Sequence, residues 1–196
     1  MKKQIFIALG IIAMVGITGC NTTYMPAANP NRSDLTGAQA SQLSRRKIHV
    51  PLRVEVHCAN SMVGQQDSAF FTDYFYYPLQ DILANSFKNA AYQVFDPPGA
   101  EVIDAFTLHV TVPESNLDVA WGNANYCLQI IVRFNEPGEK KIMALSTKKY
   151  RKIEFPEKDK VPDAIYFSCR DAAFDIMKKI LANPKTWRTV KRFEDR

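Results

Sequence analysis

The chain has 196 residues, of which 46% are hydrophobic and 23% charged, and its formal net charge is +5. A chain of this length can bury the core of one domain without help from metals or many disulfides. Seven of its basic residues lie in the tail from residue 178 to 196, against only Glu194 and Asp195. The excess positive charge is therefore a property of the tail, and nucleic acid is not expected as a partner.

Residues 1–19 have the pattern of a secretory signal peptide. Lys2 and Lys3 precede the apolar run 5–15, which is shorter than the roughly 20 apolar residues of a membrane-spanning helix. The run leads into Ile17-Thr18-Gly19-Cys20. This tetrapeptide resembles the lipobox of bacterial lipoproteins, which implies cleavage before Cys20 and a lipid on its thiol. An ordinary signal peptide and a buried hairpin helix are the alternatives.

The lipobox resemblance also implies a place in the cell. A triacylated cysteine is a practically permanent membrane anchor, because each buried methylene contributes about 0.8 kcal/mol. Asn21 follows the cysteine, where an Asp would resemble the inner-membrane retention signal of enteric bacteria. We therefore expect a protein anchored in the outer membrane and facing the periplasm.

Residues 20–45 are expected to be the lipidated cysteine and a flexible tether. They contain two prolines, a glycine and many small polar residues, with little apolar periodicity. The alternative is an ordered arm that packs on the domain through Tyr24, Met25 and Leu35.

The first half of the domain is predicted to contain a strand, a helix and a short second strand. Alternation of apolar and polar residues predicts a half-buried strand over 48–58, and Pro51 indicates a sheet edge. Helical spacing predicts a helix over 78–91, with an earlier turn from Thr72 as a variant. A short strand is expected at 92–95.

The second half is predicted to be mostly antiparallel sheet, closed by a helix. The expected elements are a strand at 105–112, a hairpin of 117–121 and 126–134, a turn at 136–139, one strand or a strand pair at 140–155, and a helix at 162–183.

This order predicts one α+β domain over residues 46–183. Its sheet is expected to be antiparallel-rich and mixed, with about five strands, and two helices should pack on one face. Residues 184–196 are predicted to be a basic amphipathic C-terminal extension.

The arrangement resembles small outer-membrane lipoproteins of the YajG type, the lipopolysaccharide-assembly lipoprotein and lipoproteins with the fold of the TolB N-terminal domain. The helix and strand of residues 79–94 are similar to their pattern, and Gly122-Asn123-Ala124-Asn125-Tyr126 resembles the start of a hairpin in the first group. The resemblance implies the fold of residues 48–183. It assigns no functional residue except Cys20.

No catalytic, metal or cofactor site is predicted. The chain has no Gly-x-Ser-x-Gly motif and no glycine-rich phosphate loop. His49, His57 and His109 are far apart in the sequence and lie on polar strand faces, so they are interpreted as solvent-facing. An enzyme is not expected.

Besides Cys20 the chain has three cysteines, Cys58, Cys127 and Cys169. An oxidising compartment would allow one disulfide among them, with three pairings open. A zinc site is the less favoured alternative, because no two of them have the spacing of a ligand pair.

Two groups of aromatic residues are candidate interfaces. Six aromatics within eight residues exceed what one face of an element can bury, although they could also fill the core around the helix start. The tail is amphipathic and could contact lipid, another subunit or its own domain. The candidate residues are Phe70, Phe71, Tyr74, Phe75, Tyr76, Tyr77, Trp187 and Phe193.

Two functions are compatible with this reading. The favoured one is a non-enzymatic structural or assembly subunit of an envelope complex, such as a secretion-system or flagellar outer-membrane ring, in a homo- or hetero-oligomer. It is supported by the anchor, an edge strand suited to pairing and the surplus aromatics. The alternative is a lipid or lipopolysaccharide transport lipoprotein that binds an amphiphile between its sheet and helices.

Overall fold

The chain was analysed as a computed structural model, which describes residues 22–24, 30–58, 62–67, 72–100, 104–120, 123–154 and 160–195. Three predicted sites, Cys20, Phe70 and Phe71, lie outside these residues. No described helix is both long and apolar enough to cross a membrane.

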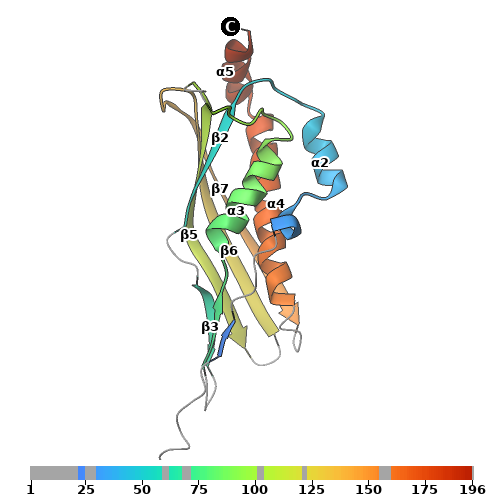
Figure 1. The fold of residues 1–196 in the computed structure, drawn as a ribbon, viewed down its shortest axis with the longest axis vertical. Coiled ribbons are helices and arrows are strands. Elements are labelled where there is room, and N and C mark those ends of the chain that lie inside the picture. The colour runs from blue at the N-terminus through green and yellow to red at the C-terminus, as the bar shows by residue number, and fades with distance from the viewer. Residues whose placement is uncertain are drawn as a thin grey trace, which may run out of the picture.

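Strands form one sheet and helices lie along one of its faces (Figure 1). The elements are β1 (Thr22–Tyr24), the 3-10 helix η1 (Pro30–Ser33), α2 (Gly37–Ser44), β2 (Leu52–His57), β3 (Met62–Asp67), β4 (Thr72–Tyr76), α3 (Leu79–Ala91), β5 (Phe106–Ala120), β6 (Asn123–Asn135), β7 (Lys141–Glu154), α4 (Lys160–Ala182) and α5 (Pro184–Glu194).

The predicted α+β class is confirmed, and the sheet is mixed and rich in antiparallel pairs. The order of the described strands is β1-β4-β3-β5-β6-β7, and β2 pairs in parallel with β5. One edge of β5 is shared, because β2 takes its first half and β3 meets it near Leu117. The long strands β5, β6 and β7, with the six-residue strand β2, form the main sheet. Three short strands, β1, β3 and β4, raise the count of described strands to seven, above the expected five.

Three local predictions were wrong. Residues 92–95 form a turn instead of a strand, because the N–H groups of Val94 and Phe95 both donate to the carbonyl of Ala91, at 2.9 and 2.8 Å. Residues 72–76 form strand β4 instead of a helical turn, as suits a run of aromatic residues. The strands expected at 105–112 and 117–121 are a single strand with a bulge after Thr111.

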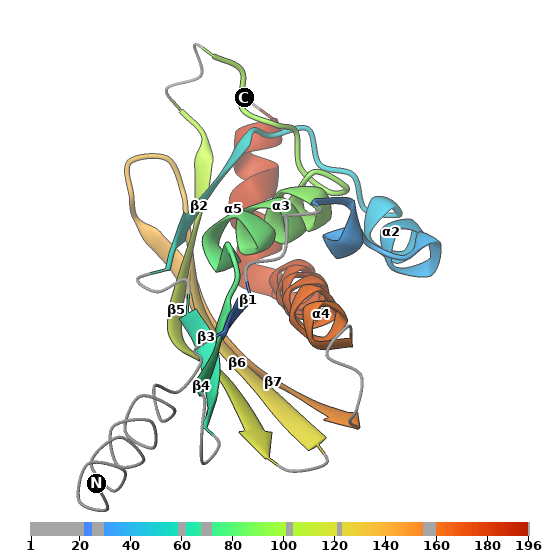
Figure 2. The same ribbon diagram turned by 60° about the horizontal axis from the view of Figure 1, so that its bottom comes forward.

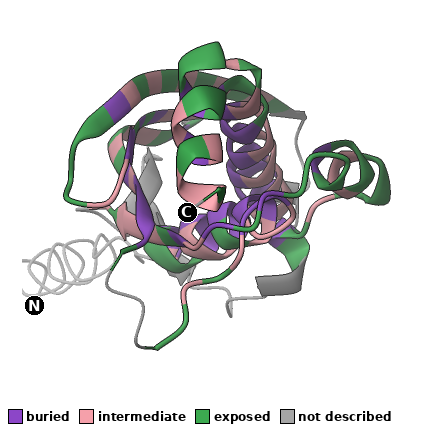
Figure 3. Cartoon of the chain, turned by 90° about the horizontal axis from the view of Figure 1, so that it is seen from above, coloured by how far each residue is buried: buried purple, intermediate pink, exposed green. Residues whose placement is uncertain are grey.

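Helices α3 and α4 cover one face of the sheet, as predicted (Figure 2). The buried residues lie where these helices meet the sheet (Figure 3). Phe87 of α3 and Ala172 and Ala173 of α4 are fully buried. The opposite face of the sheet, here called the outer face, carries no described helix.

The segment expected to be a tether is partly folded. Helix α2 begins with a capping box, in which the Thr36 hydroxyl accepts from the Gln39 N–H at 3.3 Å and the Gln39 amide oxygen accepts from the Thr36 N–H at 3.0 Å. Leu43 is 1% exposed in the core. Residues 30–45 therefore fit the ordered-arm alternative, because the cap and this buried leucine compensate for their low apolar content.

The predicted C-terminal extension is helix α5, which packs on the domain. Val190 is fully buried, and the Phe193 ring meets the Phe106 ring edge-on at 5.1 Å. Val190 and Phe193 of this amphipathic segment therefore face the domain, whereas Trp187 is 38% exposed.

Ion pairs hold α4 against β7. Asp171 pairs with Arg151, and Asp175 pairs with Lys149. Burial raises the pKa of Asp171, but hydrogen bonds from Arg170 at 3.0 Å and Gln39 at 3.2 Å, with the charge of Arg151, hold it below its ordinary value. Asp171 thus joins α2, α4 and β7.

Replacement of Asp171 by Asn should destabilise the protein at pH 7 by about 1–2 kcal/mol, because a charged acceptor with three donors is lost. The folded pKa is below the ordinary 3.8, so this contribution is present above pH 3.8 and disappears as the pH falls through the folded pKa. Urea unfolding of both proteins at several pH values measures the difference. Asp118→Asn, at an exposed residue of β5, is the control, and a difference that persists in strong acid would contradict the assignment.

The described cysteines Cys58, Cys127 and Cys169 form no disulfide with one another, and Cys127 lies on the other side of the sheet from Cys58 and Cys169. Cys127 contacts Glu114 at 3.5 Å between strands β5 and β6, and it alternates with the buried residues of β6. Cys58 packs against the core, and Cys169 is fully buried within it. Burial, with the nearby Cys58, raises the pKa of Cys169. The one pairing that needs no crossing of the sheet is Cys58 with Cys169.

If the native protein carries a disulfide, we expect it to join Cys58 and Cys169 and to leave Cys127 alkylatable. Peptide mapping of protein purified without reductant and treated with iodoacetamide tests this. A Cys127→Ser variant should keep the bridge, whereas recovery of a Cys127-containing bridge would contradict the prediction.

Candidate anion-binding site

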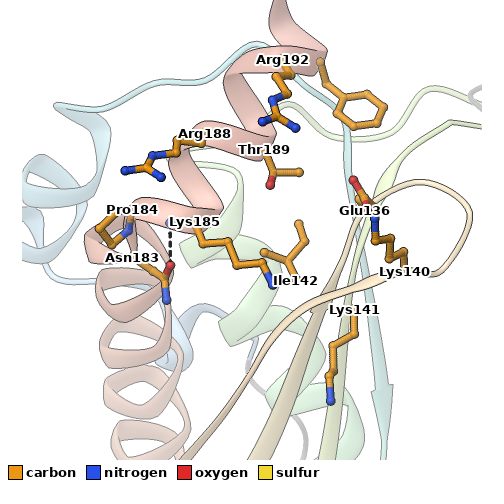
Figure 4. A pocket seen from close by; sticks show the side chains of 11 residues that line it. Glu136, Lys140, Lys141, Ile142, Asn183, Pro184, Lys185, Arg188, Thr189 and Arg192 are labelled. Atoms are coloured by element: carbon orange, nitrogen blue, oxygen red, sulfur yellow. Dashed lines mark hydrogen bonds and ion pairs between the residues drawn. The ribbon is translucent and has the colours of Figure 1, made fainter.

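A pocket of about 640 Å³ lies between α5 and the turn that joins β6 to β7 (Figure 4). Its walls come from parts of the chain more than forty residues apart. It is lined by Glu136, Lys140, Lys141, Ile142, Asn183, Pro184, Lys185, Arg188, Thr189, Arg192 and Phe193.

One wall is the first turn of α5. The Asn183 side chain caps the helix by accepting from the N–H groups of Lys185 at 2.9 Å and Thr186 at 3.3 Å. Pro184 occupies the first helical position, where a missing N–H costs nothing. Because the cap uses these donors, the positive charge of this wall comes mainly from side chains.

The other wall is a tight turn. Gly138 and Glu139 both have positive φ angles, 82° and 63°, and the Glu136 N–H donates to the Lys140 carbonyl at 3.0 Å. The Lys140 ammonium lies 3.5 Å from the Glu136 carboxylate. The charge of Glu136, the acidic residue of the lining, is therefore balanced by that of Lys140.

The other cations of the lining are Lys141, Lys185, Arg188 and Arg192, and none has a carboxylate partner among the described residues. Lys185 reaches from α5 toward Ile142, and Arg188 projects from the other side of the helix (Figure 4). Four cations without a matching acid make a local positive potential, which favours an anionic ligand or surface.

Two further pockets adjoin the first at the junction of α4 and α5. One, of about 590 Å³, is lined by Arg45, Arg46, Lys47, Trp187 and residues 181–184. The other, of about 310 Å³, shares Arg45 and Arg46 and adds Lys178. We call the three pockets together the basic end of the molecule. The arginines from residues 45–46 were not part of the predicted basic tail, because only the fold brings them beside it.

The aromatic residues predicted to form one interface have different environments in the structure. Tyr74 and Phe75 lie in β4, and Tyr76 is half-buried. Tyr77 is 3% exposed, and its burial together with the nearby Tyr166 raises its pKa. An interface role for Tyr77 is therefore wrong, because it fills the core just before α3.

The two tail aromatics also differ. Trp187 is 38% exposed at the basic end and stays a candidate contact residue, with the Lys191 ammonium 5.6 Å from its ring centre. Phe193 packs on Phe106 as part of the fold and also lines the α5 pocket, so its interface role stays a prediction.

Glu55, His57 and His109 form the group of described residues that could hold a metal ion. They lie on the outer face, where His109 contacts Glu139 of the turn beside the α5 pocket at 3.0 Å. Sequence spacing missed this group because two strands more than fifty residues apart supply it. The sequence did indicate that these residues lie on polar strand faces. It did not indicate that β2 pairs with β5, which is what brings them together.

Comparison with family models and with curated proteins finds no match. Solved structures do match. Protein XCC0632 from Xanthomonas campestris, described as DUF330, is 12% identical with a TM-score of 0.57, over 80% of this chain and 92% of that one. A minor lipoprotein from Acinetobacter baumannii is 14% identical with a TM-score of 0.46, over 70% and 94%. A putative lipoprotein from Caulobacter crescentus is 13% identical with a TM-score of 0.39, over 76% and 95%. At these identities the likeness to the first structure concerns the fold alone.

Proposed function

We propose that the chain is a non-enzymatic subunit of an envelope assembly, anchored in the outer membrane through lipid on Cys20 and contacting its partner through the basic end. The observation that carries the proposal is the group of four unmatched cations around the α5 pocket, beside the exposed Trp187. A secretion-system or flagellar outer-membrane ring is the kind of assembly we have in mind.

The separation of anchor and basic end supports a partner other than the anchoring membrane. Strand β1 lies in the lower part of the molecule and α5 at its top (Figure 1). Thr22 begins β1 two residues after Cys20, and two residues of chain span at most about 7 Å. Helix α4, with 23 residues, alone extends about 35 Å along the same axis.

This distance matters because charge attraction is short-ranged in salt. The Debye length is about 8 Å at physiological ionic strength, much less than the length of α4. Headgroups of the membrane that holds Cys20 are therefore too far away to attract the basic end. An acidic protein surface in the periplasm suits it better, since complementary charges accelerate association.

The filled interior argues against the carrier alternative in its original form. An amphiphile was expected between the sheet and the helices. Leu83 and Phe87 of α3, and Ile176 of α4, are fully buried on that face. The helices thus already occupy the place that an acyl chain would need.

In a second candidate function, the basic end binds the polar headgroup of an amphiphile and leaves its acyl chains outside the protein. The cations Lys185, Arg188 and Arg192 could bind phosphate groups of lipopolysaccharide or phospholipid presented by another membrane or carrier. The observation in its favour is that three cations lie in a pocket of about 640 Å³, large enough for a headgroup.

Photo-crosslinking in intact cells separates these functions. A benzoylphenylalanine at Arg188, which is exposed, should give a discrete adduct with an envelope protein, and Lys185→Glu with Arg192→Glu should abolish it. The matched control is the same probe at Tyr150, which is 69% exposed on β7. Adducts with lipid would favour the second candidate, and a monomer without adducts would contradict both.

The anchor has its own test. Cells fed with labelled palmitate should label the wild-type protein and the Cys58→Ala variant but not Cys20→Ala. Removal of the acceptor thiol leaves no site for the lipid, so the variant should leave the membrane fraction. Equal labelling of wild type and Cys20→Ala would contradict lipidation at this residue.

A further inference from the structure

The parallel pairing of β2 with β5 gathers two histidines and a glutamate on the outer face. In this register Glu55 lies opposite His109, and His57 lies one pair further, opposite Thr111. Alternate residues of a strand share a face, so Glu55, His57 and His109 all project from the same side. Val54, Val56, Leu108 and Val110 point to the core side instead.

The three side chains lie close enough to share one ion. Each offers a ligand atom, and these atoms all lie within 4.8 Å of one another. The Glu55 carboxylate lies 3.0 Å from Nδ1 of His109. In a tetrahedral zinc site with bonds of about 2.0–2.1 Å the ligand atoms lie about 3.3 Å apart. Small rotations of these side chains, of which His57 is exposed and Glu55 and His109 are half-buried, would bring the three atoms to that spacing.

A second carboxylate already orients His109. Its Nε2 lies 3.0 Å from the Glu139 carboxylate, which also accepts a hydrogen bond from the Asn135 side chain at 2.7 Å. Hydrogen bonds from His109 and Asn135 hold the pKa of Glu139 below its ordinary value. A carboxylate on the far nitrogen is the usual support of a metal-bound histidine, because it fixes the ring and the tautomer.

We propose that Glu55, His57 and His109 bind a divalent transition-metal ion, with zinc the best match to two imidazoles and a carboxylate. Nδ1 of His109 faces the ion, and Glu139 acts as a positioning residue through Nε2. Three protein ligands leave the fourth position to water or to a group from a partner. The proposal does not rest on the function proposed for the basic end, although Glu139 belongs to the turn that forms one wall of the α5 pocket.

Charged residues on neighbouring strands surround the proposed zinc site. Arg133 of β6 pairs in register with His109, and Arg53 precedes Glu55 by two residues on the same face. Imidazole binds a metal ion in its neutral form, so protons compete with zinc for His57 and His109.

Calorimetric titration of zinc chloride into EDTA-treated full-length protein at pH 7.5 tests the site, with about one zinc per chain expected. His57→Ala and His109→Ala should abolish this binding. Glu139→Gln should weaken it by about 10–100-fold, the usual effect of removing a supporting partner. His49→Ala is the matched control, since His49 lies elsewhere, beside Asp96 at 3.4 Å, and it should bind like the wild type.

Two further readouts keep the result unambiguous. Circular dichroism should show that His57→Ala, at an exposed residue, is folded like the wild type. Cobalt in place of zinc should give weak visible bands without the near-ultraviolet charge transfer of thiolate ligands, which excludes Cys58 or Cys127 as the binding group. Absence of stoichiometric binding, equal affinity in both histidine variants, or a thiolate spectrum would overturn the proposal.

Discussion

The pairing of β5 with its neighbours is the constraint on which the rest of the structure depends. This strand has 15 residues, and along its length it pairs with β6 on one edge and with β2 and then β3 on the other. Through its partners β5 also fixes the surface beneath the helices, since α3 packs on β2 and α4 packs on β6 and β7. The same register fixes the outer face, where it sets Glu55 beside His109. Core and candidate metal site thus depend on one alignment of strands.

Local patterns in the sequence were sufficient for the elements with strong periodicity. The helix from Pro78 and the alternation in residues 126–134 predicted α3 and β6, because one buried face dictates the spacing of apolar residues. The turn at 92–95 was missed because its hydrogen bonds return to Ala91, a choice that apolar residues do not reveal. Residues 62–67 lack a clear alternation and were not recognised as β3.

The candidate sites were harder to predict than the fold, for a related reason. The basic tail could be read from its composition, but Arg45 and Arg46 join it only through the packing of α2 on α4. His57 and His109 are 52 positions apart and meet through a parallel pairing. Parallel pairing leaves no local mark comparable to a hairpin turn, so ligand spacing along the chain could not show the cluster.

The folding of residues 30–45 onto the domain changes how an anchored molecule would behave. A long flexible linker would let the domain tumble and sample a wide volume. Binding to a partner would then stop that motion at a cost in entropy. With α2 docked through Leu43 and Asp171, and with β1 in the sheet directly after Cys20, little slack is left. A chain anchored at Cys20 would then act as a rigid spacer, presenting α5 at a set height above the bilayer. A partner would then meet a binding surface that is already oriented. The effective concentration of that surface for a partner in the same membrane would rise accordingly.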